Sequence, residues 1–220
     1  MKNSLFPALS SVVVRCETPQ TTHDQLFDVH IPKHIYVKGF QGSKQQQDLF
    51  ATAHRCMNNW CFLKPARAYV LGLFVDHAAL NRLKAHADVS RDDIFTTDCP
   101  KSFVLYFASS KDIKHIKRGF TRSFENFIKN RPELQLNMIQ HFLAVLDGQE
   151  GLSRGDFIRV SCQPALNTLT VAFNDKTEVV IPNAAGLIDW IHSLYVGLES
   201  NPTARYVSMQ QKLRLASPLD

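Results

Sequence analysis

The 220-residue sequence predicts an α+β fold, in which strands pair with strands in hairpins and helices come in blocks. Two observations lead to this prediction. Strand-like apolar runs precede two strongly periodic helices, and a further pair of strands separates those helices from the last ones. An α/β protein would instead alternate strands and helices one for one. With 45% apolar and 20% charged residues, the composition is that of a globular protein with a sizeable core.

Strands dominate the first half of the predicted fold. Apolar runs at 12–15, 35–40 and 102–108 each predict a strand. Residues 42–48 are polar and rich in glutamine, so we expect a loop there. Residues 77–87 place alanine and leucine at helical spacing and predict a short amphipathic helix.

The run at 67–76 is the most informative segment of the chain. It is almost continuously apolar, which is typical of a strand that is buried on both faces or that lines a cavity. Residues 61–63 and the Lys64-Pro65 turn that follows them predict a hairpin into this strand. Gly72 interrupts the run, and a glycine inside a strand indicates either a β-bulge or the close approach of another group.

Two long amphipathic helices are expected next. In 110–128, isoleucine and phenylalanine recur at steps of three and four, and Ser110 can cap the start of this helix. A second helix is predicted over 132–146, with Pro132 in the first turn, where proline is tolerated. We interpret the phenylalanine stripe of the first helix as core packing. The alternative is that Phe120 or Phe124 also touches a ligand.

The last third of the chain returns to strands and then to helices. Residues 157–161 and 168–173 predict a second hairpin. Asn183 caps a helix expected over 184–198, and residues 203–214 predict a final helix. This order of elements completes the α+β pattern.

We expect a single domain over 31–216, preceded by an N-terminal extension over 1–30. The N-terminus lacks the pattern of a signal peptide, and no stretch reaches the roughly 18 consecutive apolar residues of a membrane span. Five cysteines at irregular spacing argue against a disulfide framework and fit a reducing compartment. We therefore expect a cytoplasmic location.

The net charge of +5 arises largely in segment 111–131, which we interpret as a solvated helix face. The alternative is an interaction module in which the basic helix at 110–128 binds an anionic partner. No RNA-binding signature or recognition-helix pattern accompanies the basic residues, so no nucleic-acid partner is expected. The sequence also lacks HExxH, CxxC, GxSxG, P-loop and GxGxxG motifs, so we expect neither a metal nor a cofactor.

Arg55 and Tyr69 are the polar residues that we connect with a ligand. Arg55 offers a planar fork suited to a carboxylate or phosphate, and Tyr69 adds a hydroxyl within the apolar strand. The alternatives are a surface arginine that covers Trp60 or pairs with an acid, and a tyrosine of the core. A tight turn at Lys64-Pro65 would place the two side chains on opposite faces, whereas a wider loop or a bulge would return them to one face.

Several loose matches in the right order resemble a known family over roughly residues 35–213. They are an arginine before a hairpin, the strand ARAYVLGLFV, the strand-to-helix passage FVLYFASSKDIKHIKRGF, the strand GDFIRV, and the helix end WIHSLYVG followed by a proline. Together they resemble the chalcone isomerase-like family, which contains isomerases that close a chalcone to a flavanone and relatives that bind fatty acids without that activity. The resemblance implies an open antiparallel sheet with helices packed on one face and a ligand cleft between them.

The resemblance also implies roles for the two polar candidates. Arg55 matches the family's arginine that faces the ligand anion. Tyr69, three residues before Gly72, matches a position that is threonine in the isomerases and tyrosine in the fatty-acid binders. Both matches favour a ligand whose anionic end lies beside these side chains.

Other positions depart from the isomerase pattern. Leu194, three residues before Gly197, replaces a hydroxyl-bearing residue of plant isomerases, and the isomerases' tyrosine and helical asparagine fall near Ile113 and Phe120. Closing a chalcone requires donors aimed at a developing enolate, and these positions are apolar. Binding a fatty acid requires only a clamp for the carboxylate and a dry channel for the tail.

The sequence therefore predicts a binding protein, rather than an enzyme, that takes up a fatty acid or a similar apolar anion. Its predicted ligand-binding residues are Arg55, Tyr69, Phe120 and Leu194. One alternative is an intramolecular lyase or isomerase of a small phenolic compound, with Arg55 holding the anion and Tyr69 donating a proton. The other is the interaction module based on the helix at 110–128.

Overall fold

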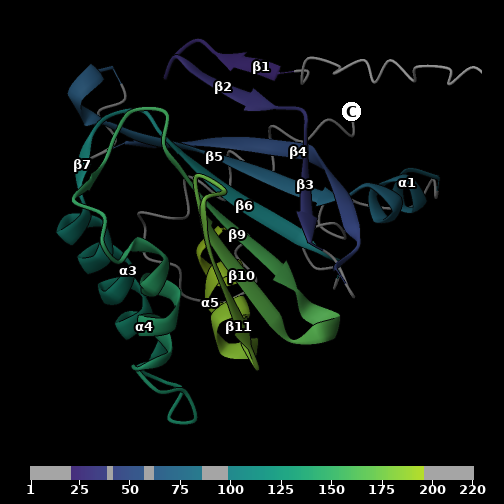
Figure 1. Cartoon of the computed structure of the whole chain (residues 1–220), viewed down its shortest axis with the longest axis vertical. Helices are drawn as coiled ribbons and strands as arrows, with labels where there is room; N and C mark the ends of the chain where they lie inside the picture. Colours follow the sequence, from purple (N-terminus) through teal and green to yellow (C-terminus); the bar gives the residue numbers. More distant parts are fainter. Residues whose placement is uncertain (1–20, 39–41, 57–61, 86–98, 196–220) are drawn as a thin grey trace, which may run out of the picture.

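The computed structural model describes residues 21–38, 42–56, 62–85 and 99–195. Its main feature is one curled, seven-stranded antiparallel sheet (Figure 1). The strands are β3 (His34–Lys38), β4 (Lys44–Cys56), β5 (Arg67–Asp76), β6 (Lys101–Phe107), β9 (Phe157–Gln163), β10 (Thr168–Phe173) and β11 (Thr177–Pro182). Their order in the sheet is β11-β10-β9-β6-β5-β4-β3, so β5 and β6 lie near its centre.

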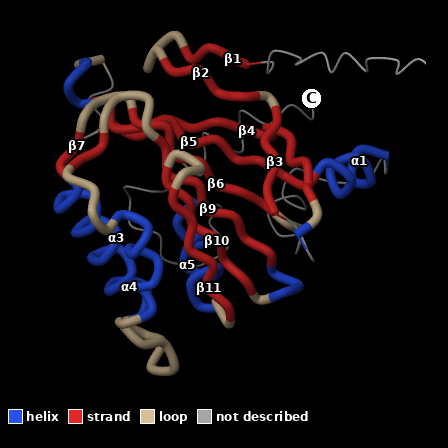
Figure 2. The backbone as a smooth tube through the Cα atoms, viewed as in Figure 1, coloured by secondary structure: helices blue, strands red, loops and turns tan. Residues whose placement is uncertain are grey.

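The remaining elements flank this sheet (Figure 2). Two small antiparallel pairs are β1 (Thr21–Asp24) with β2 (Val29–Pro32), and β7 (Lys111–Asp112) with β8 (Gly151–Leu152). The helices are α1 (His77–Ala85), α3 (Ile113–Ile128), α4 (Met138–Leu143) and α5 (Ala185–Tyr195). Short 3-10 turns are η3 (Lys64–Ala66), η4 (Ala144–Leu146) and η5 (Pro164–Leu166).

The two faces of the sheet carry separate cores. Side chains alternate along a strand, so Leu71 and Leu73 of β5 point to one face and Val70 and Phe74 to the other. The first face, which we call the helix face, packs against the four helices in one large apolar cluster. The second, which we call the hairpin face, packs against the β1–β2 hairpin. The α+β fold with helices on one face is therefore confirmed.

The β1–β2 hairpin is anchored on the sheet by apolar and polar contacts. Phe27, in its turn, is 2% exposed and stacks on His54 of β4, with ring centroids 4.7 Å apart. His54 Nε2 also lies 2.6 Å from a carboxylate oxygen of Asp24. The hairpin spans both sides of the domain boundary expected near residue 30, and that boundary stays a proposal.

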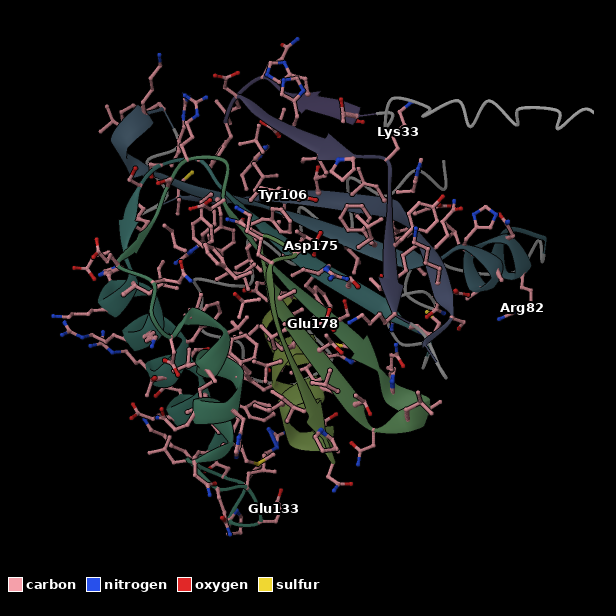
Figure 3. All side chains as sticks on the ribbon, in the orientation of Figure 1. Lys33, Arg82, Tyr106, Glu133, Asp175 and Glu178 are labelled. Atoms are coloured by element: carbon pink, nitrogen blue, oxygen red, sulfur yellow. The ribbon has the colours of Figure 1, made fainter. Side chains whose placement is uncertain are left out.

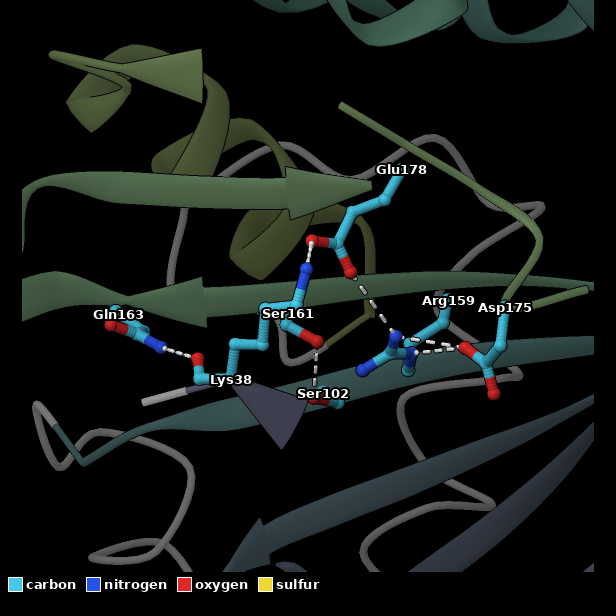
Figure 4. A network of polar contacts seen from close by, with 7 residues as sticks. All are labelled: Lys38, Ser102, Arg159, Ser161, Gln163, Asp175 and Glu178. Atoms are coloured by element: carbon cyan, nitrogen blue, oxygen red, sulfur yellow. Dashed lines mark hydrogen bonds and ion pairs between the residues drawn. The ribbon is translucent and has the colours of Figure 1, made fainter. Parts of the chain in front are cut away.

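The curl of the sheet brings its two edge strands close to each other (Figure 4). Lys38, at the end of β3, donates a hydrogen bond of 2.9 Å to Glu178 of β11. Gln163 of β9 donates one of 2.7 Å to the Lys38 carbonyl. These contacts close the hairpin face into a concave surface.

Several sequence-based predictions are confirmed. The strand predicted over 67–76 is β5, with the same bounds, and the helix predicted over 110–128 contains α3. The hairpin near the C-terminal end is β9 paired with β10. The predicted segments 12–15 and 203–214 lie outside the described residues.

Other predictions for the first half of the chain are wrong. Of the loop expected over 42–48, residues 44–48 belong to β4, where they pair with β3 and, at Gln47 and Asp48, with β5. Within 61–63, Phe62 and Leu63 form a turn and a bend, and the strand that pairs with β5 is β4. Strands β1, β2 and β11 were not anticipated.

The helix predicted over 132–146 is confirmed over 138–146 and wrong over 132–137. Only α4 and η4 form in this segment. The residues before α4 are turns, in which amides bond to carbonyls three residues earlier, such as Leu134 to Arg131 and Met138 to Gln135. These turns bring Leu134 against α5, where a Cβ on Gly186 would lie 2.4 Å from a Leu134 methyl group. The predicted cap of α3 changes as well, because Asp112, not Ser110, accepts a bond from the Lys114 amide.

Gly72 marks a close approach, and the bulges lie elsewhere. A Cβ at Gly72 would lie 2.9 Å from the Phe74 ring and 3.5 Å from a Leu49 methyl group. The register shifts between β4 and β5 occur instead between Leu49 and Ala51 and between Arg55 and Cys56. Of the two interpretations of this glycine, the structure supports the close approach.

No helix within the described ranges is long and apolar enough to cross a bilayer. Cys56 takes part in a disulfide, whereas Cys99 and Cys162 are free and buried. The disulfide departs from the reducing environment that the cysteine pattern favours. The cytoplasmic location stays a prediction.

Candidate functional site

Arg55 and Tyr69 lie directly opposite each other on β4 and β5. Directly opposed residues of an antiparallel pair project from the same face of the sheet. That face is the helix face, because Ala51 and Ala53, which alternate with Arg55 along β4, belong to its core. The bulge at Arg55 and Cys56, together with the long β4–β5 connection, gives the shared face that a tight turn would have prevented.

Tyr69 stands at the border between the apolar core and the polar candidate Arg55. It is partly buried and packs against the cluster of the helix face. Its ring meets the ring of Phe107, its partner on β6, edge to face with centroids 5.9 Å apart. After Phe107 the chain continues into β7 and α3, so the pair lies at the end of the sheet next to the start of α3.

Phe120 and Leu194 face the same core from two helices. Phe120 of α3 is partly buried and contacts the rings of Phe142 and Trp190, with centroids 5.1 Å and 6.1 Å away. Leu194 of α5 is buried in the cluster. The structure thus brings Arg55 and Tyr69 together and places Phe120 and Leu194 across the core from the sheet. The role of all four in ligand binding stays a proposal.

The helix face also holds buried titratable groups that the sequence did not single out. Lys101 of β6 and His192 of α5 are both buried, and so is Cys162 opposite Lys101 on β9. Burial, with a smaller effect of the Lys101 charge, lowers the pKa of His192 to about 4. Burial raises the pKa of the Cys162 thiol to about 12, so it stays protonated and is a poor nucleophile.

These groups offer little acid–base chemistry at neutral pH. A neutral buried histidine and a protonated buried thiol belong to the core. Cys162 pairs with Lys101 at one end of β6, whereas Tyr69 pairs with Phe107 at the other end. Within the described ranges, no group of three or more histidine, cysteine, aspartate or glutamate residues could hold a metal ion. The arrangement around Arg55 and Tyr69 is suited to holding an anion beside an apolar core.

No protein-family model matches the sequence, and no curated protein matches it. Among solved structures, the chain is similar to the crystal structure of a fatty-acid binding protein from Arabidopsis thaliana. The two align with a TM-score of 0.65 at 17% sequence identity, and the match covers 91% of this chain and 98% of the other. At this identity the likeness shows the fold, which confirms the chalcone isomerase-like architecture that the sequence predicts.

Proposed function

We propose that the protein binds a fatty acid or a similar apolar anion on the helix face, with Arg55 and Tyr69 at the polar end of the ligand. The observation that carries this proposal is the direct pairing of Arg55 with Tyr69 on the face that packs against the helices. The fatty-acid binding protein that shares the fold supports the same class of ligand.

A carboxylate leaves water only where a cation replaces its hydration. The guanidinium of Arg55 has five N–H donors, so it can serve a carboxylate in addition to a protein acceptor. The Tyr69 hydroxyl can donate a further bond to the same group. The tail would then extend toward Phe120 and Leu194, and each buried methylene would contribute about 0.8 kcal/mol.

We expect Arg55→Ala to weaken the binding of dodecanoate by about 1.5 to 3 kcal/mol, the range for a hydrogen bond to a charged group. Tyr69→Phe should cost about 0.5 to 1.5 kcal/mol, because a neutral donor is lost. Methyl dodecanoate should bind worse than the acid to the wild-type protein. Isothermal titration calorimetry with the acid and the ester measures all three effects.

Arg67→Ala is the matched control for this experiment. The Arg67 guanidinium lies 5.9 Å from the centroid of the Phe27 ring, on the opposite face of the sheet, so its removal should leave dodecanoate binding unchanged. If the acid and the ester bind equally well and Arg55→Ala behaves like Arg67→Ala, the proposed clamp does not exist.

The same arrangement disfavours the isomerase alternative. Phe120 and Leu194 have apolar side chains, and Phe120 lies among the rings of Phe142 and Trp190. We therefore expect no conversion of naringenin chalcone above the spontaneous rate. The decay of chalcone absorbance measures this rate. An acceleration of about 10³, or roughly 4 kcal/mol of barrier lowering, would favour the enzyme over the binder.

A further inference from the structure

A cavity of about 620 Å³ lies on the hairpin face, on the other side of the sheet from Arg55 and Tyr69. Its floor includes Val104 and Tyr106 of β6, with Arg159 of β9 beside them. Residues of the β1–β2 hairpin, such as Val29, form its roof. A volume of this size falls within the range of small-molecule sites.

Polar contacts hold the walls of this cavity in place. Arg154 forms an ion pair with the Asp28 carboxylate and donates a bond of 3.0 Å to the Asp28 carbonyl, which joins the turn of the hairpin to the loop before β9. Outside the residues that line the cavity, the bond between Lys38 and Glu178 links the two edges of the sheet (Figure 4). A roof and walls that are fixed in this way define a preformed site.

Tyr106 brings a hydroxyl to the lining of the cavity. The residue is 6% exposed, and its ring lies against Phe157, with centroids 5.7 Å apart. Among the described residues, the structure gives its hydroxyl no hydrogen-bond partner. Figure 3 shows Tyr106 beneath the hairpin, with Asp175 nearby. A hydroxyl that lines a cavity and has no protein acceptor can donate a hydrogen bond to an acceptor of a ligand.

The charges around the cavity are already compensated. Arg159 holds Asp175 through two nitrogens, at 3.0 Å and 2.8 Å from the same carboxylate oxygen, and lies 3.7 Å from Glu178. Arg154 is paired with Asp28. An incoming anion would therefore meet the Asp28 and Asp175 carboxylates, which already engage the two arginines among the lining residues, whereas a neutral molecule avoids this repulsion.

The Tyr106 hydroxyl is suited to donate a hydrogen bond, because it does not ionise at neutral pH. Burial, with a smaller effect of the Asp175 carboxylate, raises the pKa of Tyr106, so the phenol stays protonated. The surrounding side chains of Val29, Val104 and Phe157 are apolar. The complement of such a site is an apolar molecule with one hydrogen-bond acceptor.

We propose that this cavity is a second binding site, which takes a neutral, largely apolar molecule through a carbonyl oxygen that accepts a hydrogen bond from Tyr106. The site is independent of the proposed fatty-acid site, because the two lie on opposite faces of the sheet. Their ligands also differ in charge, so each site can be tested while the other remains intact.

The test uses prodan, a neutral naphthalene ketone whose emission shifts to the blue in apolar surroundings, and the full-length protein. We expect saturable binding with a blue shift, and a dissociation constant about three- to tenfold higher in Tyr106→Phe, as for the loss of one neutral hydrogen bond. Tyr106→Phe keeps the ring against Phe157 and removes a hydroxyl without a partner, so folding should be preserved. Tyr36→Phe, the same change at an exposed tyrosine of β3, is the matched control and should bind like the wild type.

Three competitors of the same shape identify the ligand class. We expect 2-acetylnaphthalene to displace prodan better than 2-ethylnaphthalene, which lacks an acceptor, and better than 2-naphthoate, which is an anion. The preference for the ketone over the hydrocarbon should disappear in Tyr106→Phe. Dodecanoate should not compete, and Arg55→Ala should leave prodan binding unchanged.

Two results would overturn the proposal. The first is equal prodan affinity in the wild type, Tyr106→Phe and Tyr36→Phe, which would show that the hydroxyl contacts no ligand. The second is competitive displacement by dodecanoate together with a loss of prodan binding in Arg55→Ala, which would place the probe on the helix face. Either result would leave the proposed binding of dodecanoate itself untouched.

Discussion

Replacing Trp190 with alanine should lower the free energy of unfolding by about 3 to 5 kcal/mol, the largest effect that we expect of any single substitution here. Trp190 of α5 is fully buried, and its ring meets Phe124 and Phe142 edge to face, with centroids 5.4 Å and 5.2 Å away. Its indole nitrogen donates a bond of 3.2 Å to the Ser123 hydroxyl. The substitution would leave a cavity where α3, α4 and α5 meet. Urea denaturation followed by circular dichroism measures the loss.

Two further variants test whether the loss of stability arises from the packing of the buried ring, and not from the removal of any aromatic side chain. Trp190→Phe keeps an aromatic ring in the cluster and should cost clearly less than alanine. Phe62→Ala removes a ring that is 74% exposed and should change stability by no more than about 0.5 kcal/mol. A loss below about 1 kcal/mol in Trp190→Ala would mean that the aromatic cluster does not hold the helices. Because Phe120 also contacts Trp190, we expect the alanine variant to bind dodecanoate more weakly.

The parts of the fold that could be predicted are those whose signal is local. The continuous apolar run of β5 and the stripe of α3 both carry their period in the sequence itself. The first half of β4 carries no such signal, because Gln45, Gln46 and Gln47 are stabilised as a strand by their partners on β3. The bounds of β4 therefore depend on pairing that only the tertiary structure supplies.

The candidate site was predictable in its residues but not in its geometry. Arg55 and Tyr69 stand out in the sequence, but their shared face depends on a bulge that no residue type announces. The cavity on the hairpin face could not be predicted from the sequence pattern. Ser102, Val104 and Tyr106 alternate with Phe103, Leu105 and Phe107 in a segment that is apolar on both faces, so the pattern could not show which face Tyr106 occupies.

We expect the protein to lose about 2 kcal/mol of stability as the pH falls from 7 to 5, mainly because of His192. Burial lowers the pKa of His192 from 6.5 to about 4 in the folded protein, with the Lys101 charge as a smaller cause. Between these two values the unfolded chain binds a proton that the folded protein does not, so stability rises with pH through this window and levels off above it. The full effect of the shift corresponds to about 3 kcal/mol.

The pH window distinguishes His192 from the acidic groups. Hydrogen bonds from His23 and Arg154 lower the pKa of Asp28. At Asp48 burial raises the pKa, but hydrogen bonds from Gln46 and His77 outweigh it and lower the pKa overall. The stability linked to these two carboxylates is therefore lost mainly below pH 5. Among the described residues, His192 Nε2 has no hydrogen-bond partner. His192→Leu therefore removes both the titration and an unpaired polar atom, and it should flatten the stability profile between pH 7 and 5.

The exposed His141 of α4 provides the matched control, and we expect His141→Leu to keep the slope of the wild type. Denaturation curves at half-unit steps of pH measure the three profiles. The comparison depends on slopes and not on absolute stabilities, because leucine also changes the packing around Phe103, whose ring lies 6.0 Å from that of His192. Equal slopes in the wild type and His192→Leu would mean that the pKa of His192 is the same in the folded and the unfolded protein, and therefore that burial does not lower it.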